Sequence, residues 1–108
     1  MADHLAVTTT IDSQSAAEEL ARAAVTARVA ACAQVEGPIS SVYRWQGEVT
    51  TDTEWRVLFK TTAARYPELA ALVRARHVYE VPQLVATEIV EGGADYLAWV
   101  TAETTPGG

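Results

Sequence analysis

The residues best suited to chemistry lie in one short stretch, Ala75 to Gln83, which reads ARHVYEVPQ. It holds one of the chain's two histidines, His77, followed by Tyr79 and by Glu80. A neutral imidazole near a carboxylate suits a first-row metal ion such as copper or zinc. The same histidine also suits a structural role at the end of a helix, where it can hydrogen-bond a helix carbonyl. Both interpretations of His77 and Glu80 are open at this point.

Two residue types that occur once each add further chemistry. Cys32 carries the softest donor in the chain, and its thiolate would favour Cu(I), although a free cysteine usually behaves as a small buried residue. Lys60 precedes two threonines, and an ammonium group with hydroxyls can hold an anion such as phosphate. A salt bridge from Lys60 to Glu54 or Glu80 is the alternative.

Aromatic residues form a third group of candidates. Tyr43, Trp45 and Tyr79 are expected to line a ligand cleft with a polar rim. Packing at a subunit interface, where tyrosine and tryptophan are enriched, is the alternative. Trp99 lies in a short amphipathic segment near the C-terminus and is the expected interface anchor.

The segments that must position these residues alternate between strand and helix patterns. The patterns predict strands over 4–11, 39–45, 53–62 and 83–92, and helices over 13–29, 66–77 and 94–103. Ser15 and Glu18 have the spacing of a helix capping box, and Asp95 is the expected cap of the last helix. The strand pattern that begins near residue 31 is interrupted at Gly37 and Pro38. A tight turn at 46–48 joins the two middle strands into a hairpin.

The order β-α-β-β-α-β-α is that of the split βαβ, ferredoxin-like arrangement, an α+β sandwich. Right-handed crossovers place the two longer helices on one face of an antiparallel sheet. The chain carries more large apolar side chains than that inner face can hold, namely Tyr43, Trp45, Trp55, Phe59, Leu84, Val85 and Ile89. The surplus predicts that the other sheet face, or a sheet edge, packs on another subunit.

Composition narrows the function classes. The 108 residues predict a single domain spanning 1–108, and the net charge of -6 argues against nucleic acid or an anionic membrane as a partner. No apolar run approaches the roughly 18 residues of a membrane span. The N-terminal residues lack a secretory pattern and one cysteine suits a reducing compartment, so a cytoplasmic location is expected. The absence of Walker, G-x-G-x-x-G, C-x-x-C and H-E-x-x-H motifs argues against a conventional hydrolase or nucleotide-binding enzyme.

Several stretches taken together resemble the CutA divalent-cation tolerance family, in family order and spacing over about residues 5–103. They are AAC at 30–32, ISSVYRWQG at 39–47, E at 54, LFKTT at 58–62, YPEL at 66–69, HVYEVPQL at 77–84 and DYLAWV at 95–100. The resemblance implies a ferredoxin-like domain that assembles as a homotrimer similar to the PII signalling proteins. It also implies a cytoplasmic protein with copper binding as its usual attribution and no established enzymatic reaction.

The positions that match the family are Cys32, Tyr43, Trp45, Gly47, Glu54, Lys60, Thr61, His77, Tyr79, Glu80, Pro82, Tyr96 and Trp99. Three positions depart from it. Gln34 replaces a common asparagine, Val78 replaces a proline, and Gln83 replaces a glutamate. The loss of a carboxylate at Gln83 removes one potential metal ligand and counts against a tight metal site there.

The resemblance favours a homotrimer that binds copper or another divalent cation through His77, Glu80 and Cys32, with no obligatory cofactor. One alternative is a PII-like sensor that holds a small anionic ligand in an intersubunit cleft. That cleft would be lined by Tyr43, Trp45, Lys60, His77, Tyr79 and Glu80. A structural trimer with no ligand is the remaining alternative.

Overall fold

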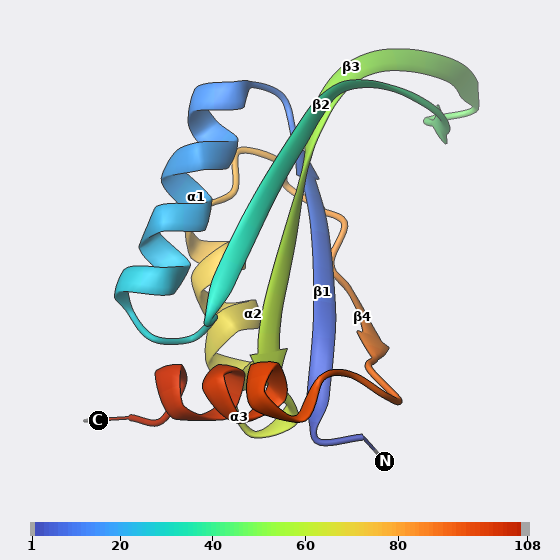
Figure 1. Cartoon of the computed structure of the whole chain (residues 1–108). Helices are drawn as coiled ribbons and strands as arrows, with labels where there is room; N and C mark the ends of the chain where they lie inside the picture. Colours follow the sequence, from blue (N-terminus) through green and yellow to red (C-terminus); the bar gives the residue numbers. More distant parts are fainter. Residues whose placement is uncertain (1, 107–108) are drawn as a thin grey trace.

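The computed structural model describes residues 2–106, whose four strands form one antiparallel sheet in the order β2-β3-β1-β4 (Figure 1). The elements are β1 (His4–Ile11), α1 (Gln14–Thr26), β2 (Cys32–Trp45), β3 (Glu48–Thr62), a 3-10 turn η1 (Ala63–Arg65), α2 (Tyr66–Arg76), β4 (Val85–Glu88) and α3 (Ala94–Glu103). This order and strand arrangement confirm the predicted α+β, ferredoxin-like sandwich.

The hydrophobic core lies between the sheet and the two helices α1 and α2. From the sheet it takes the fully buried Phe59, Val57 and Val7, and the helices contribute residues such as Leu20 and Leu69. Alternate residues of β3 point to the opposite face, because successive side chains of a strand alternate across the sheet. Alanines on the buried stripe of α1 allow that helix to lie close to the strands.

Two helix starts differ from the sequence-based prediction. Ser13, rather than the pair Ser15 and Glu18, caps α1: its Oγ accepts a hydrogen bond of 3.1 Å from the backbone N–H of Ala16. The cap residue of α3 is Gly93, without a side-chain hydrogen bond, and Asp95 lies inside the first turn. Both predictions failed because the pattern of a sequence locates the first residue of a helix only to within one or two positions.

Strand β4 is shorter than the predicted segment 83–92. It pairs with β1 over four residues, from Val85 opposite Thr8 to Glu88 opposite Leu5. Before this pairing begins, the carbonyl of Gln83 accepts a hydrogen bond of 2.6 Å from Thr9 Oγ1, so the chain is held by a side chain instead of by the ladder.

The β2–β3 hairpin extends well beyond the helices and curves away from them (Figure 1). We call its distal part, residues 39–54, the arm. The predicted interruption at Gly37 proves to be a bulge between Glu36 and Ile39 within one continuous strand. A side chain at Gly37 would come within 2.6 Å of the Trp55 ring, so glycine is needed there. At the tip, Gln46 and Gly47 both have positive φ (50° and 83°), as a two-residue type I′ turn requires.

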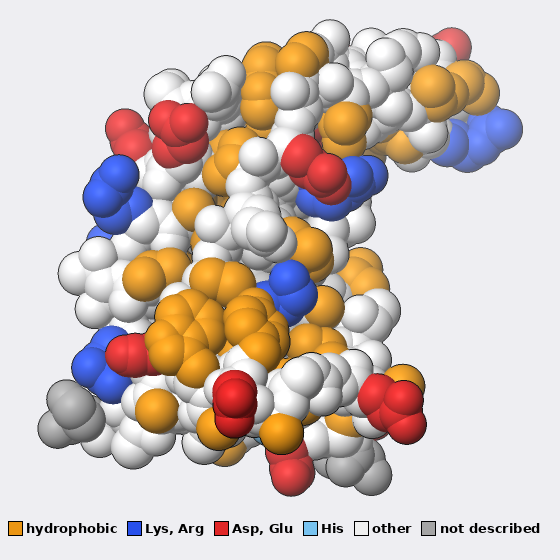
Figure 2. Space-filling view, in the orientation of Figure 1, with side chains coloured by type: hydrophobic (Ala, Val, Ile, Leu, Met, Phe, Trp, Pro, Cys, Tyr) orange, Lys and Arg blue, Asp and Glu red, His pale blue; other side chains and the backbone are white. Residues whose placement is uncertain are grey.

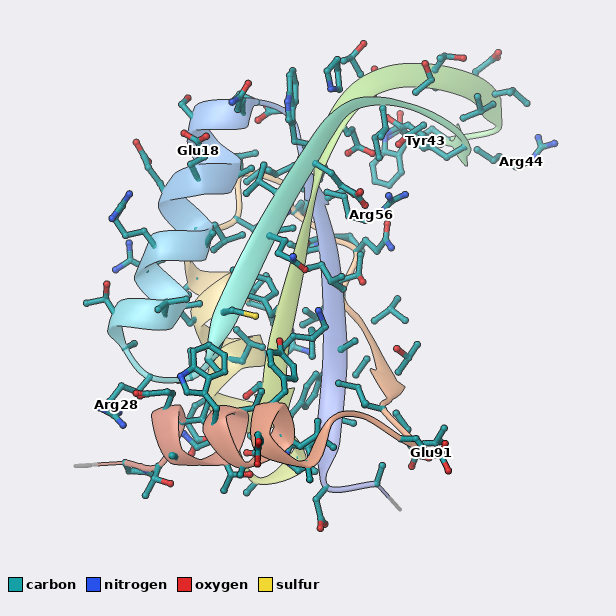
Figure 3. All side chains as sticks on the ribbon, viewed as in Figure 1. Glu18, Arg28, Tyr43, Arg44, Arg56 and Glu91 are labelled. Atoms are coloured by element: carbon teal, nitrogen blue, oxygen red, sulfur yellow. The ribbon has the colours of Figure 1, made fainter. Side chains whose placement is uncertain are left out.

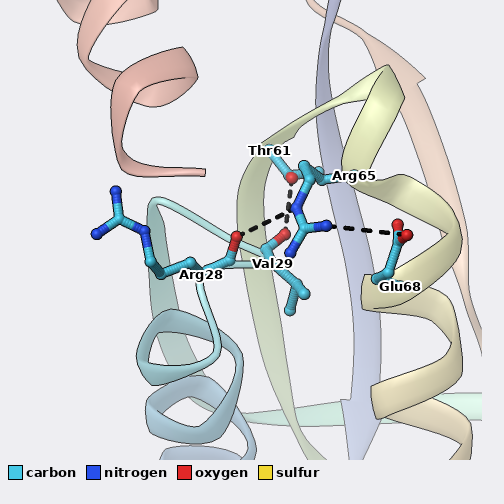
Figure 4. Close-up of polar contacts among 5 residues, drawn as sticks. All are labelled: Arg28, Val29, Thr61, Arg65 and Glu68. Atoms are coloured by element: carbon cyan, nitrogen blue, oxygen red, sulfur yellow. Dashed lines mark hydrogen bonds and ion pairs between the residues drawn. The ribbon is translucent and has the colours of Figure 1, made fainter. Parts of the chain in front are cut away.

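The opposite end of the hairpin is fixed to the helical layer. Thr61 Oγ1 donates a hydrogen bond of 2.7 Å to the carbonyl of Val29, and Arg65 Nε donates one of 3.4 Å to the carbonyl of Arg28 (Figure 4). Arg65 is also 3.8 Å from the Glu68 carboxylate. These contacts tie the loop after α1 to the end of β3, so one end of the hairpin is anchored and the other projects.

Candidate functional site

A cavity of about 530 Å³ lies beneath the arm, where the space-filling view shows the molecule hollowed (Figure 2). Its lining residues come from β1, the arm and the loop after α2. They are Thr10, Ser41, Val42, Tyr43, Trp45, Glu54, Tyr79, Glu80, Val81 and Gln83. Four of the predicted site residues are therefore brought together: Tyr43, Trp45, Tyr79 and Glu80. The ring of Tyr43 lies under the curve of the arm, whereas Arg44 points away from the molecule (Figure 3).

Carboxylates hold the two tyrosines of the cavity. Tyr79 Oη donates a hydrogen bond of 2.7 Å to Glu54 Oε2, and Tyr43 Oη donates one to Asp52 Oδ2. Glu54 is a charged residue with only 7% of its surface exposed. Burial, followed by the hydrogen bond to Glu54, raises the pKa of Tyr79. The hydrogen bond to Asp52 is the main cause that raises the pKa of Tyr43. Both hydroxyls therefore stay protonated and act as donors at neutral pH.

His77 supports the cavity from behind. It follows the last residue of α2, and its Nε2 donates a hydrogen bond of 2.8 Å to the carbonyl of Thr10. Its Nδ1 accepts one of 3.0 Å from the backbone N–H of Tyr79, and the two rings lie 4.8 Å apart. The prediction that His77 hydrogen-bonds a helix carbonyl was therefore wrong, because its imidazole bonds the carbonyl of Thr10 on β1. A metal ion on His77 would have to displace one of these two bonds.

Cys32 and Lys60 lie elsewhere in the sheet, opposite each other on β2 and β3. Cys32 Sγ is 3.3 Å from Tyr96 Oη, and Lys60 Nζ donates a hydrogen bond of 3.3 Å to Gln34 Oε1. The predicted salt bridges of Lys60 to Glu54 or Glu80 are absent from the described ion pairs. Thr10, which lines the cavity, pairs with Arg56 on β3, and Lys60 lies four residues further along that strand. At about 3.3 Å a residue, Lys60 is therefore roughly 13 Å along the strand from this part of the cavity. Neither residue lines the cavity.

Trp99 lies on α3, whose hydrophobic side chains gather with those of the sheet on the face shown in Figure 2. The Trp99 side chain is 44% exposed, and its ring centroid is 5.7 Å from that of Tyr96. The contact with Cys32, and then burial, raise the pKa of Tyr96 to about 12. Trp99 is thus partly free to contact another molecule, as an interface anchor must be; that role stays a prediction.

Sequence reasoning did not place Glu54 in the cavity, although it matched the family at that position. The strand also carries Asp52, Arg56 and Lys60, so the sequence pattern held no signal that singled out Glu54. Across residues 2–106, no group of three His, Cys, Asp or Glu side chains is arranged to hold a metal ion. In the same residues, no helix is both long enough and apolar enough to cross a membrane.

Comparisons with known proteins agree over most of the chain. The family model described as CutA1 divalent ion tolerance protein matches residues 5–103. The divalent-cation tolerance protein CutA of Thermus thermophilus is 43% identical over 95 residues, which are 88% of this chain and 92% of that protein. Protein CutA of Homo sapiens is 37% identical over 95 residues, but the chain spans only 53% of its length.

Solved structures give the same result for the fold. The Cut A1 structure from Thermus thermophilus superposes with a TM-score of 0.92 at 41% identity, over 94% of this chain and 99% of that one. The CutA structure from Xylella fastidiosa gives a TM-score of 0.94 at 31% identity, over 96% and 100% of the two chains. The sequence, the strand order and the relatives agree, and this chain therefore belongs to the CutA1 divalent ion tolerance family.

Proposed function

We propose that this chain acts as a homotrimer that binds divalent cations, with copper as the first candidate, and that it binds ligands and does not catalyse a reaction. The observation that carries the proposal is the family match over residues 5–103. The net charge of -6 supports it, because an excess of carboxylates concentrates cations near the protein. The proposed metal ligands are Glu80, His77 and Cys32, contributed at surface or intersubunit positions.

Exposed apolar side chains support the trimer. Val42, Trp45 and Val49 on the arm are 65%, 51% and 66% exposed, and Trp99 adds a further aromatic ring on α3. Exposed side chains of this size commonly mark protein interfaces, and the arm and α3 lie at opposite ends of the sheet, so they offer separate contact surfaces (Figure 1). Strands β2 and β4 also form the two edges of the sheet, where unpaired backbone groups are available to a neighbouring chain.

Light scattering at several protein concentrations tests the assembly. The expected mass is three times that of one chain, and Val42→Glu should lower it by placing a charge on an apolar contact surface. A mass of one chain at every concentration would contradict the trimer. Val25→Glu is the matched control, because Val25 is 40% exposed on α1 and lies outside the proposed interface.

Calorimetric titration with Cu(II) tests the ligands. Glu80→Gln and Cys32→Ala should each weaken binding, because each removes one donor, while Glu18→Gln on the outer side of α1 should leave it unchanged (Figure 3). His77→Ala alone is less informative, since it also releases Tyr79. Equal Cu(II) binding in all variants would remove these residues from the metal site.

The location we propose is the cytoplasm, supported by a single free cysteine that suits a reducing compartment. Relatives differ in this respect, since the one from Arabidopsis thaliana is named chloroplastic and the structure from Archaeoglobus fulgidus is named periplasmic. Cell fractionation followed by immunodetection is the test, and recovery outside the cytoplasmic fraction would contradict the proposal.

The cavity supports a second function, the sensing of a small molecule. Aromatic walls with a few polar groups and a volume of about 530 Å³ are typical of ligand sites. The anionic ligand was predicted for a cleft between subunits that includes Lys60, and Lys60 of the same chain lies outside the lining of this cavity. A structural trimer without a ligand would require that neither metal ions nor small molecules raise the melting temperature, because binding to the native state must stabilise it.

A further inference from the structure

The charge of the cavity lining is one-sided. Glu54 and Glu80 contribute two carboxylates, whereas no lysine, arginine or histidine is among the lining residues within 2–106. Asp52 lies close by, since it accepts the hydrogen bond of Tyr43. A ligand that carries negative charge would meet repulsion from these carboxylates, and a positively charged ligand would be attracted.

Within this chain, Glu54 has no positively charged partner among the described residues. It is more than nine-tenths buried, and its carboxylate accepts one described hydrogen bond, from Tyr79. The nearest arginine along β3 is Arg56, whose Nη1 is 2.5 Å from Glu36 and which does not line the cavity. A buried carboxylate is costly unless a cation or several donors compensate it. The cavity beside Glu54 is where such a cation can be accommodated.

The aromatic residues determine what kind of cation fits. Tyr43, Trp45 and Tyr79 line the same cavity, and both tyrosine hydroxyls donate to carboxylates. A phenol that donates to an anion has a more electron-rich ring, which strengthens its attraction for a cation. Aromatic rings combined with carboxylates are the usual surroundings of alkylammonium groups in proteins.

A bare metal ion suits this cavity less well. Divalent cations such as Ca²⁺ and Mg²⁺ need six or more oxygen ligands at about 2.0–2.6 Å. Here two carboxylates face a space of about 530 Å³ that is walled largely by aromatic and aliphatic side chains. A space of that size holds an organic molecule, whose carbon atoms can contact the rings while its charge is neutralised at the carboxylates.

We propose that the cavity beneath the arm binds a small organic ammonium ion, with Glu54 and Glu80 compensating its charge and Tyr43, Trp45 and Tyr79 surrounding its alkyl groups. The proposal rests on the small-molecule function proposed above for this cavity and names its ligand class. It is separate from the proposed divalent-cation binding, with which it shares only Glu80. It requires that positive charge, and not apolar shape alone, determines binding.

The first experiment compares choline with its uncharged carbon analogue, in which a tert-butyl group replaces the trimethylammonium group. Both are titrated into the wild-type protein by calorimetry, with the fluorescence of the three tryptophans as a second signal. Choline should bind at least roughly tenfold more tightly than the analogue, because the two differ in charge but hardly in shape. Equal affinities, or no binding of choline, would overturn the proposal.

The second experiment removes the charge from the cavity. Glu54→Gln keeps an oxygen that can accept the Tyr79 hydrogen bond but removes the negative charge, and it should weaken choline binding by at least about tenfold. Glu18→Gln on α1 removes one negative charge far from the cavity and should leave the affinity unchanged (Figure 3). If Glu54→Gln fails to fold, Glu80→Gln and Tyr43→Leu test the same point at exposed positions of the cavity lining.

A Cu(II) titration of the same variants separates this proposal from the metal-binding one. Choline binding that is lost in Glu54→Gln while Cu(II) binding is retained supports two separate sites. If Cu(II) binding is lost in Glu54→Gln and choline does not bind the wild type, the cavity is a metal site and the ammonium proposal is overturned, although the proposed function stands. Tighter binding of inorganic phosphate than of choline would also overturn it.

Discussion

The two ends of the β2–β3 hairpin are built from the same pair of strands but lie in opposite environments. Near the helices, Val57 and Phe59 are fully buried in the core. On the arm, Val42 and Val49 are 65% and 66% exposed although they belong to the same ladder. The backbone pairing is continuous at both ends apart from one bulge, so hydrogen bonding does not distinguish them.

The difference shows that burial in this chain is decided by which strand residues the helices cover. The anchored end gains its stability from the packing of α1 and α2, whereas the arm exposes apolar side chains that its own chain does not cover. The arm is consequently the part of the molecule that can serve a partner or a ligand without weakening the core. Four predictions test this contrast.

The largest effect is expected for Phe59→Ala in the core. The change removes the largest fully buried side chain and leaves a cavity between the sheet and the helices, which should cost about 3–5 kcal/mol of unfolding free energy. Denaturant unfolding measures this loss. A cost below about 1 kcal/mol would mean that the core can collapse around the missing ring and is less tightly packed than its burial indicates.

A matched pair on β3 compares the two ends directly. Val57→Thr places a hydroxyl in the core without changing the shape of the side chain, and should cost about 1–3 kcal/mol. Val49→Thr makes the same chemical change on the arm and should alter the stability of the dissociated chain by less than about 0.5 kcal/mol. Thermal unfolding measures both variants at a protein concentration low enough for light scattering to show a monomer, and again at a higher one. A larger cost at Val49 that appears only at the higher concentration would show that a second copy covers the arm, whereas a cost equal to that of Val57→Thr in the monomer would contradict the contrast.

Tyr79→Phe tests the connection between the loop after α2 and the base of the arm. Removing the hydroxyl leaves the buried carboxylate of Glu54 without its described hydrogen-bond donor. The free energy of unfolding should fall by roughly 1–2 kcal/mol, because a buried acceptor without a partner is destabilising. Denaturant unfolding measures the cost. Tyr66→Phe is the control, since Tyr66 donates no described side-chain hydrogen bond. Equal effects of the two variants would argue against a role of the Glu54 contact.

The smallest effect on stability, but a clear spectroscopic one, is expected at Tyr96. Its pKa is raised to about 12, with the contact to Cys32 as the first cause, so Cys32→Ala should lower this pKa toward the ordinary value of about 10. Because folding raises the pKa of Tyr96, the stabilisation from its protonated form is present below about pH 10 and is lost as the pH rises through about 12.

Tyrosinate absorbance followed against pH measures the pKa of Tyr96. Cys32→Ser keeps a polar partner and should shift the pKa less; identical titrations in all three proteins would exclude the contact as the cause.

The periodicity of the sequence was sufficient to predict the order of strands and helices and the sheet arrangement. Alternation on β3 correctly placed Val57 and Phe59 on one face and Lys60 on the other, since side-chain direction follows directly from strand geometry. The predicted helix caps and the predicted length of β4 were less accurate, because the exact start of a helix and the end of a strand depend on contacts with neighbouring segments.

Within the candidate site, the sequence by itself determined which residues carry chemistry, and Tyr43, Trp45, Tyr79 and Glu80 do share one cavity. Only the tertiary structure decided that Lys60 and Cys32 lie apart from them and that Glu54 joins them. The physical reason is that spacing along the chain fixes neighbours within an element. The curvature of the arm and the course of the loop after α2, which bring distant residues together, depend on contacts between elements.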